Sequence, residues 1–89
     1  MTDLGEQFRI ASENVKNLAE KPPNDTLLKL YALYKQGTEG DIKGEKPGFM
    51  DFKGLFKYNA WEELKGKSKE DAQAEYIDLV NTLLKQWGH

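Results

Sequence analysis

The sequence predicts an all-α protein, a four-helix bundle with a long loop between the second and third helices. Apolar residues recur at steps of three and four in four segments, which is typical of amphipathic helices. No segment shows the apolar–polar alternation of a half-buried strand, and Gly or Pro residues lie between the four segments. Because 89 residues offer room for one core, we expect a single domain over residues 1–89.

The first predicted helix carries one apolar stripe, made of Leu4, Phe8, Ala11, Val15 and Leu18. Asp3 and Glu6 are spaced like a capping box, which would start the helix. Proline disfavours helical backbone in the residue before it, so we expect Pro22-Pro23 to end this helix.

The second helix is expected to have Asn24 as its N-cap and to run to about Gln36, where Gly37 would end it. Its apolar residues cover more than one face: Leu27, Leu28, Leu30, Tyr31, Leu33 and Tyr34. Such a helix should contact several neighbours or a ligand. A glycine-rich loop follows to Met50, and long loops in small domains are often functional.

Asp51 is expected to cap a third helix that ends at Gly66, and Ser68 a fourth that ends at Gly88. The third has apolar residues at helical spacing, namely Phe52, Leu55, Phe56, Ala60 and Leu64. The stripe of the fourth consists of Ala72, Tyr76, Leu79, Val80, Leu83 and Trp87. We expect Trp61, Leu79, Val80, Leu83 and Trp87 to be core residues.

The composition argues against several functions. A formal net charge of −2 disfavours sequence-independent nucleic-acid binding, which needs a positive excess. The chain has no cysteine, its one histidine is His89, and Ser12 and Ser68 have no evident base beside them, so we expect no enzyme. No acidic cluster has the spacing of a calcium loop, so no metal or cofactor is expected.

The expected location is the cytosol. No apolar run is long enough to span a membrane, and the first residues lack the charged-then-apolar layout of a signal peptide.

The residues most informative about chemistry lie on the second and third helices. Tyr31 and Lys35 are one turn apart, so a phenol hydroxyl and an ammonium should project from one face. Lys53 and Lys57 present two further ammonium groups one turn apart. Together these groups are suited to hold a phosphate. Spacing alone equally allows ordinary core tyrosines and a solubilising lysine surface.

Seven short motifs follow one another from the second helix to the start of the fourth. They are Tyr31-Ala32-Leu33-Tyr34-Lys35-Gln36, Gly40-Asp41, Pro47-Gly48, Asp51-Phe52-Lys53-Gly54, Lys57-Tyr58-Asn59-Ala60-Trp61, Glu63-Leu64-Lys65-Gly66 and Ser68-Lys69-Glu70-Asp71-Ala72. In this order they resemble the acyl-CoA-binding protein family, and the likeness covers about Phe8 to Gly88. The family's four-helix fold agrees with the helices predicted from periodicity.

The resemblance implies an intracellular carrier that binds medium- to long-chain fatty acyl-CoA, for transport and buffering, and does no chemistry on it. The implied site holds the CoA 3′-phosphate with Tyr31, Lys35 and Lys57, and the adenine lies against Tyr34. The other implied contacts are Tyr76 on the CoA part, Phe8, Ser12 and Lys16 on the nucleotide side, Leu27 and Leu28 on the acyl chain, and Lys53 as a further candidate. The ligand is the fatty acyl-CoA itself, with no separate cofactor.

As for partners, the same resemblance implies transient contact with enzymes that use acyl-CoA and no stable membrane insertion. A monomer is the simplest expectation. Two other functions stay open: a module whose exposed aromatics bind a partner helix in a groove, and a detached domain of an acyl-CoA enzyme.

The sequence departs from the family pattern in four places. Phe56 stands where the family usually has a small residue, and Leu55 replaces a common lysine. These two changes leave the acyl-length preference open. Tyr58 replaces a tryptophan, and Ser12 an alanine, and both changes should be tolerated.

Overall fold

The computed structural model describes residues 3–44, 48 and 51–87, with the side chain of Trp87 outside that part. Its elements are α1 (Leu4–Asn14), the single 3₁₀ turn η1 (Val15–Asn17), α2 (Asn24–Glu39), α3 (Phe52–Glu62) and α4 (Lys69–Trp87). The predicted all-α class with four α-helices is therefore confirmed, and the described residues contain no strand. No helix in this part is long and apolar enough to cross a bilayer.

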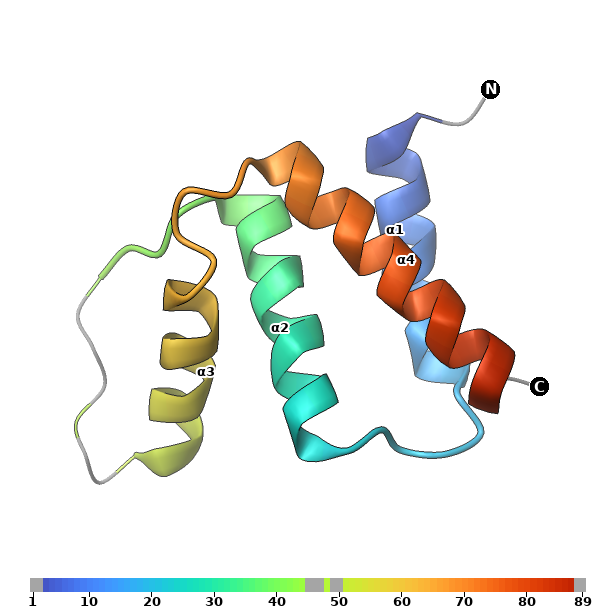
Figure 1. Cartoon of the computed structure of the whole chain (residues 1–89), viewed down its shortest axis with the longest axis horizontal. Coiled ribbons are helices and arrows are strands. Elements are labelled where there is room, and N and C mark those ends of the chain that lie inside the picture. The colour runs from blue at the N-terminus through green and yellow to red at the C-terminus, as the bar shows by residue number, and fades with distance from the viewer. Residues whose placement is uncertain (1–2, 45–47, 49–50, 88–89) are drawn as a thin grey trace.

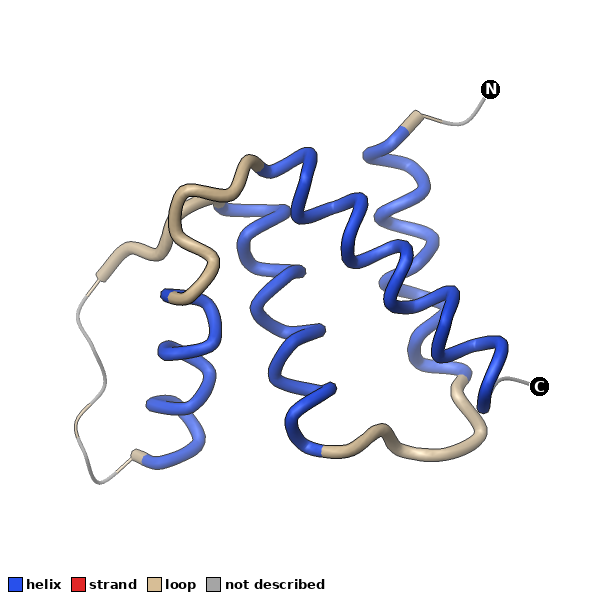
Figure 2. Tube along the Cα trace, viewed as in Figure 1, coloured by secondary structure: helices blue, strands red, loops and turns tan. Residues whose placement is uncertain are grey.

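The helices form a flat slab with principal extents of 40 × 29 × 15 Å. α2 lies at the centre, with α3 packed on one side and α4 on the other, while α1 packs against α4 (Figure 1). The described residues that follow α2, 40–44, lead toward the α3 edge of the slab (Figure 2). The core comes from α1, α2 and α4 and consists of Phe8, Ala11, Leu30, Leu33, Ala72, Tyr76, Val80 and Leu83.

The first helix is shorter than predicted. Asp3 caps it as expected, because its carboxylate accepts the Glu6 backbone N–H at 2.7 Å. However, α1 ends at Asn14, the chain tightens into η1, and Leu18 is extended. Pro22-Pro23 therefore does not end this helix. Asparagine is a weak helix former and helices often tighten into 3₁₀ turns at their ends, so the helix stops before the prolines.

The boundaries of the second helix also differ from prediction. Asn24 is its first helical residue, and Pro23 occupies the N-cap position without a side-chain hydrogen bond. At the other end α2 passes Gly37, ends at Glu39 and is followed by Gly40 with φ of +83°. The expectation that Gly37 ends the helix is wrong, because Gly40 adopts the left-handed backbone that favours glycine.

Gly37 instead allows three helices to approach closely. It is buried within α2, and its carbonyl accepts the Gln73 side-chain amide of α4 at 2.8 Å. A Cβ at this position would lie 3.0 Å from the Phe8 ring of α1 and 3.0 Å from Gln73 Cγ. Packing between helices, rather than helix termination, thus explains this glycine.

The predicted caps of the last two helices are confirmed. The Asp51 carboxylate accepts the Gly54 N–H at 3.0 Å, and Ser68 Oγ accepts the Asp71 N–H at 3.0 Å. α3 ends at Glu62, so Gly66, with φ of +95°, closes the following turn and not the helix itself. Gly88 and His89 lie outside the described residues.

Most of the predicted core is confirmed. Trp61, Val80 and Leu83 are buried, and Leu79 is half-buried against the core. Trp87 cannot be compared, because its side chain lies outside the described part.

Candidate ligand-binding site

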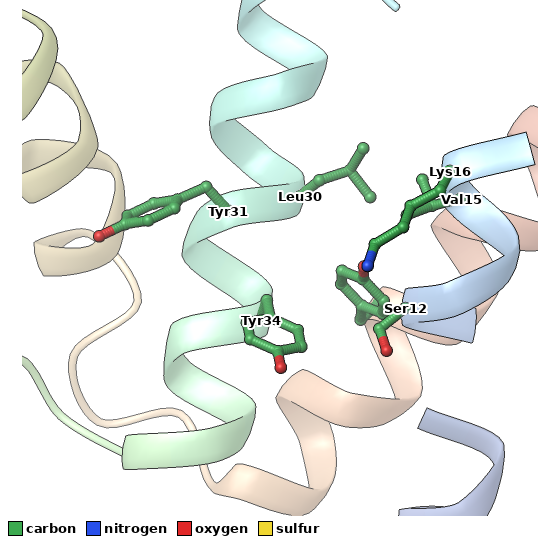
Figure 3. Close-up of a pocket in the computed structure, with 7 residues that line it drawn as sticks. Ser12, Val15, Lys16, Leu30, Tyr31 and Tyr34 are labelled. Carbon is green, nitrogen blue, oxygen red and sulfur yellow. The ribbon is translucent and has the colours of Figure 1, made fainter. Parts of the chain in front are cut away.

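A cavity of about 290 Å³ opens between α2, α4 and the segment formed by α1 and η1. It is lined by Ser12, Val15, Lys16, Leu30, Tyr31, Tyr34 and Tyr76. Figure 3 shows Ser12 and Lys16 on the α1–η1 side, facing the residues of α2 across the cavity. Five side chains predicted from the sequence to contact ligand therefore line one cavity, although they come from four elements.

An aromatic cluster lies beside this cavity. The ring of Phe8 stacks on Tyr34 with centroids 5.4 Å apart and meets Tyr76 edge-on at 5.1 Å. Phe8 and Tyr76 are only 6% and 4% exposed, whereas Tyr34 is 41% exposed. Two buried rings therefore support a third whose surface is open to a planar ligand group.

Tyr76 belongs to both the core and the cavity. Burial, and to a lesser extent the nearby Tyr34, raises the pKa of its phenol to about 12. The hydroxyl therefore stays protonated at neutral pH and remains available as a hydrogen-bond donor.

Two lysines lie where α2 faces α3, each over an aromatic ring. Lys57 Nζ is 5.2 Å from the centroid of Tyr31, and Lys35 Nζ is 5.3 Å from that of Trp61. Tyr31 extends from α2 toward α3 (Figure 3). These cation–π contacts hold both ammonium groups near the Tyr31 side of the cavity.

Lys35 also has an acidic partner, since its ammonium pairs with Glu39 one turn further along α2. The hydrogen bond to Glu39 is the main reason that the pKa of Lys35 is raised above its ordinary value. Lys35 is therefore fully charged, but an incoming anion has to compete with Glu39.

A second cavity, of about 340 Å³, lies between α2 and α3. Its lining is Asp25, Leu28, Lys29, Ala32, Phe56, Asn59, Ala60, Glu63 and Leu64. Apolar side chains from both helices thus border a space on the other side of α2 from the first cavity. Phe56, the bulky departure from the family pattern, is 55% exposed at this cavity.

The remaining predicted residues are more dispersed. Leu28 lines the second cavity, whereas Leu27 is half-buried and packs against the core. Lys53 is exposed on α3 and lines neither cavity.

Sequence reasoning missed several residues around the site. Leu30 and Val15 were assigned only to apolar stripes, yet both line the first cavity. Trp61 was assigned to the core, yet it lies under Lys35. Gln36 was also missed, although the sequence held a signal for it. It follows Leu33 by three positions and so lies on the same buried face of α2, where a polar residue indicates a hydrogen-bonded amide.

The side chains that line the cavities indicate the kind of ligand that the site is suited to bind. Within the described ranges, no group of three His, Cys, Asp or Glu side chains is placed to hold a metal ion. The site instead combines cations, phenol groups, an open aromatic ring and two partly apolar cavities. Such a surface is suited to an amphipathic anion with a planar aromatic group.

A family model described as acyl CoA binding protein matches residues 5–80. The chain belongs to the acyl-CoA-binding protein family. The family resemblance inferred from the sequence motifs is thereby confirmed. The matched range includes every residue that lines either cavity.

Individual relatives cover nearly the full chain. It is 52% identical to acyl-CoA-binding protein homolog 1 of Caenorhabditis elegans, covering 91% of this chain and 94% of that one. It is 49% identical to the Saccharomyces cerevisiae acyl-CoA-binding protein, covering 94% and 97%.

Solved structures of family members share the fold. The crystal structure of Oryza sativa acyl-CoA-binding protein 2 superposes with a TM-score of 0.91 at 40% identity, covering 94% of this chain and 93% of that one. For the solution structure of the yeast acyl-coenzyme A binding protein, the TM-score is 0.76 at 48% identity, covering 96% and 99%.

Proposed function

We propose that this chain binds long-chain fatty acyl-CoA esters and carries them without chemical change. The observation that carries the proposal is the placement of two lysines from adjacent helices beside a tyrosine-lined cavity. Membership of the acyl-CoA-binding protein family supports the same ligand.

In this proposal the CoA 3′-phosphate binds at the α2–α3 boundary. The phosphate is held by the side chains of Tyr31, Lys35 and Lys57, and the cation–π contacts already orient both ammonium groups. A hydrogen bond between charged groups contributes about 1.5–3 kcal/mol, so two lysines supply a large share of the headgroup affinity.

The adenine is proposed to stack on the exposed face of Tyr34, which Phe8 supports from beneath. Stacking of a base on an aromatic side chain contributes about 1–3 kcal/mol. Ser12 and Lys16 then line the nucleotide side of the same cavity, and the phenol of Tyr76 adds a contact to the CoA part.

The acyl chain is proposed to lie between α2 and α3. Leu28 and Phe56 border that cavity, and Lys53 projects from the first turn of α3. Leu27, which the family resemblance also assigned to the acyl chain, packs against the core and is not part of this cavity. Each buried methylene contributes about 0.8 kcal/mol, so affinity should rise with chain length until the space is full.

Isothermal titration calorimetry with palmitoyl-CoA, free CoA and palmitate tests this function. The ester should bind much more tightly than either part, because only the ester engages the lysines and the apolar cavity together. Equal binding of palmitate and palmitoyl-CoA, or no binding of the ester, would contradict the proposal. The monomeric state, the cytosolic location and contact with acyl-CoA enzymes stay predictions.

A further inference from the structure

Gln36 has a buried side chain whose amide joins three parts of the fold. The side chain has no exposed surface, and it lies beside Lys35 in α2. Its Nε2 donates to Asp41 Oδ1 at 2.9 Å and to the Lys67 carbonyl at 2.7 Å. Its Oε1 accepts the indole N–H of Trp61 at 3.1 Å. One side chain thus connects α2 to the end of α3, to the loop after α2 and to the segment before α4.

The partners of Gln36 are themselves held in place. The Trp61 indole N–H also donates to the Gly40 carbonyl at 2.9 Å. Asp41 Oδ1 accepts the Gly66 backbone N–H at 2.8 Å, and this bond, followed by the Gln36 amide, lowers the pKa of the Asp41 carboxyl. The amide therefore lies at the centre of a network that fixes the position of the Trp61 ring.

The Trp61 ring contacts one of the two lysines and shares a helix face with the other. Lys35 Nζ lies over its face at 5.3 Å. Lys57 precedes it by one turn on α3, so the two side chains project from the same face of that helix. A shift of Trp61 would move the surface under Lys35 and change the distance of Lys57 from α2.

We infer that Gln36 is a positioning residue for the phosphate site, setting the arrangement of Lys35 and Lys57 through Trp61 without touching ligand. This inference rests on the proposed function, because it concerns recognition of the 3′-phosphate. Hydrogen bonds to a phosphate weaken steeply when donors are misaligned, so a displaced ammonium loses much of its contribution. An apolar side chain of equal size would fill the space but would leave α3 and the loop without this fixed connection.

The test is the ratio of affinities for palmitoyl-CoA and its 3′-dephospho analogue, measured by calorimetry on the full chain. Gln36→Met keeps side-chain length and removes the amide. Loss of a residue that orients a metal ligand typically costs about 10–100-fold in affinity, and by analogy this variant should reduce the ratio about tenfold. Trp61→Phe keeps a ring under Lys35 but removes the indole N–H, so it should reduce the ratio in the same direction. If Gln36→Met does not fold, Trp61→Phe decides.

Gln73→Met is the matched control. Gln73 also has a partly buried amide bound to a backbone carbonyl, that of Gly37 at 2.8 Å, but it lies on α4 and lines neither cavity. This variant should lower the melting temperature and leave the ratio unchanged. An unchanged ratio in Gln36→Met overturns the inference. Where that variant does not fold, an unchanged ratio in Trp61→Phe does the same. An equal change of the ratio in Gln73→Met also overturns it. A wild-type protein that does not distinguish the two ligands overturns the proposed function instead.

Discussion

Replacing Lys35 by methionine removes the ammonium while keeping an unbranched stem over Trp61. In the free protein Lys35 pairs with Glu39, and its side chain is 29% exposed, so this pair contributes only about 0.3–0.5 kcal/mol to stability. A charged hydrogen bond to the 3′-phosphate is worth about 1.5–3 kcal/mol. After the loss of the Glu39 pair is subtracted, about 1–2.5 kcal/mol of binding free energy should depend on Lys35. At about 1.4 kcal/mol per tenfold, the Kd should rise about 5- to 60-fold.

Calorimetric titration with palmitoyl-CoA and 3′-dephospho-palmitoyl-CoA measures this loss. The Kd for the dephospho ligand should hardly change, because the group that Lys35 binds is missing. Lys85→Met is the control: it removes the same charge from the exposed last turn of α4. An equal loss for both ligands, or an equal effect of Lys85→Met, would refute a phosphate contact and leave only a general effect of charge.

Four further changes test the fold and the site. Gly37→Ala should lower the melting temperature by about 4–24 °C, since overpacking costs about 1–3 kcal/mol and each kcal/mol is about 4–8 °C in a domain of this size. Circular dichroism melting checks this, with Gly5→Ala, where a Cβ meets only ordinary contacts, as the variant that should not be destabilised. Folding lowers the pKa of the Asp41 carboxyl below its ordinary value of 3.8. The ionised carboxylate therefore stabilises the folded protein above pH 3.8, and this stabilisation is lost as the pH falls through the pKa of the folded state. Urea unfolding of Asp41→Asn should show a shallower loss of stability below about pH 4, and identical acid slopes would contradict the assigned hydrogen bonds. The pKa of the Tyr76 phenol is raised from 10.0 to about 12. The protonated phenol therefore contributes fully to folding stability below pH 10, and this contribution is lost as the pH rises to 12. Tyr76→Phe should lack this alkaline loss, and parallel curves for the two proteins would show that the phenol is not shielded. Phe56→Ala enlarges the cavity between α2 and α3 and should shift acyl-CoA preference toward longer chains. Titration with a series of acyl lengths checks this, and an unchanged profile would place the chain elsewhere.

Much of the fold could be predicted because its causes are local. The apolar periodicity predicted four helices, and Asp3, Asp51 and Ser68 act as caps because each accepts an N–H within three residues. Helix ends were less predictable. Gly37 has the composition of a helix stop, but its role depends on Phe8 and Gln73, which belong to other helices.

The candidate site was predictable in part, and for two reasons. Tyr31 and Lys35 are one turn apart on α2, so their spacing predicted that they share a face, whereas Tyr34 was assigned by the family resemblance. Ser12, Lys16 and Tyr76 came only from the family resemblance, and tertiary structure brings them to the same cavity.

The sequence by itself determined the helices, most of their caps, the core stripes and the family, because these depend on residue order and nearest neighbours. Only the tertiary structure decided that Trp61 supports Lys35, that Gln36 binds Trp61 and the Lys67 carbonyl, and that two cavities lie on opposite sides of α2. Those features depend on helix packing, in which residues 25 or more positions apart come into contact and their positions along the chain no longer predict the distance between them.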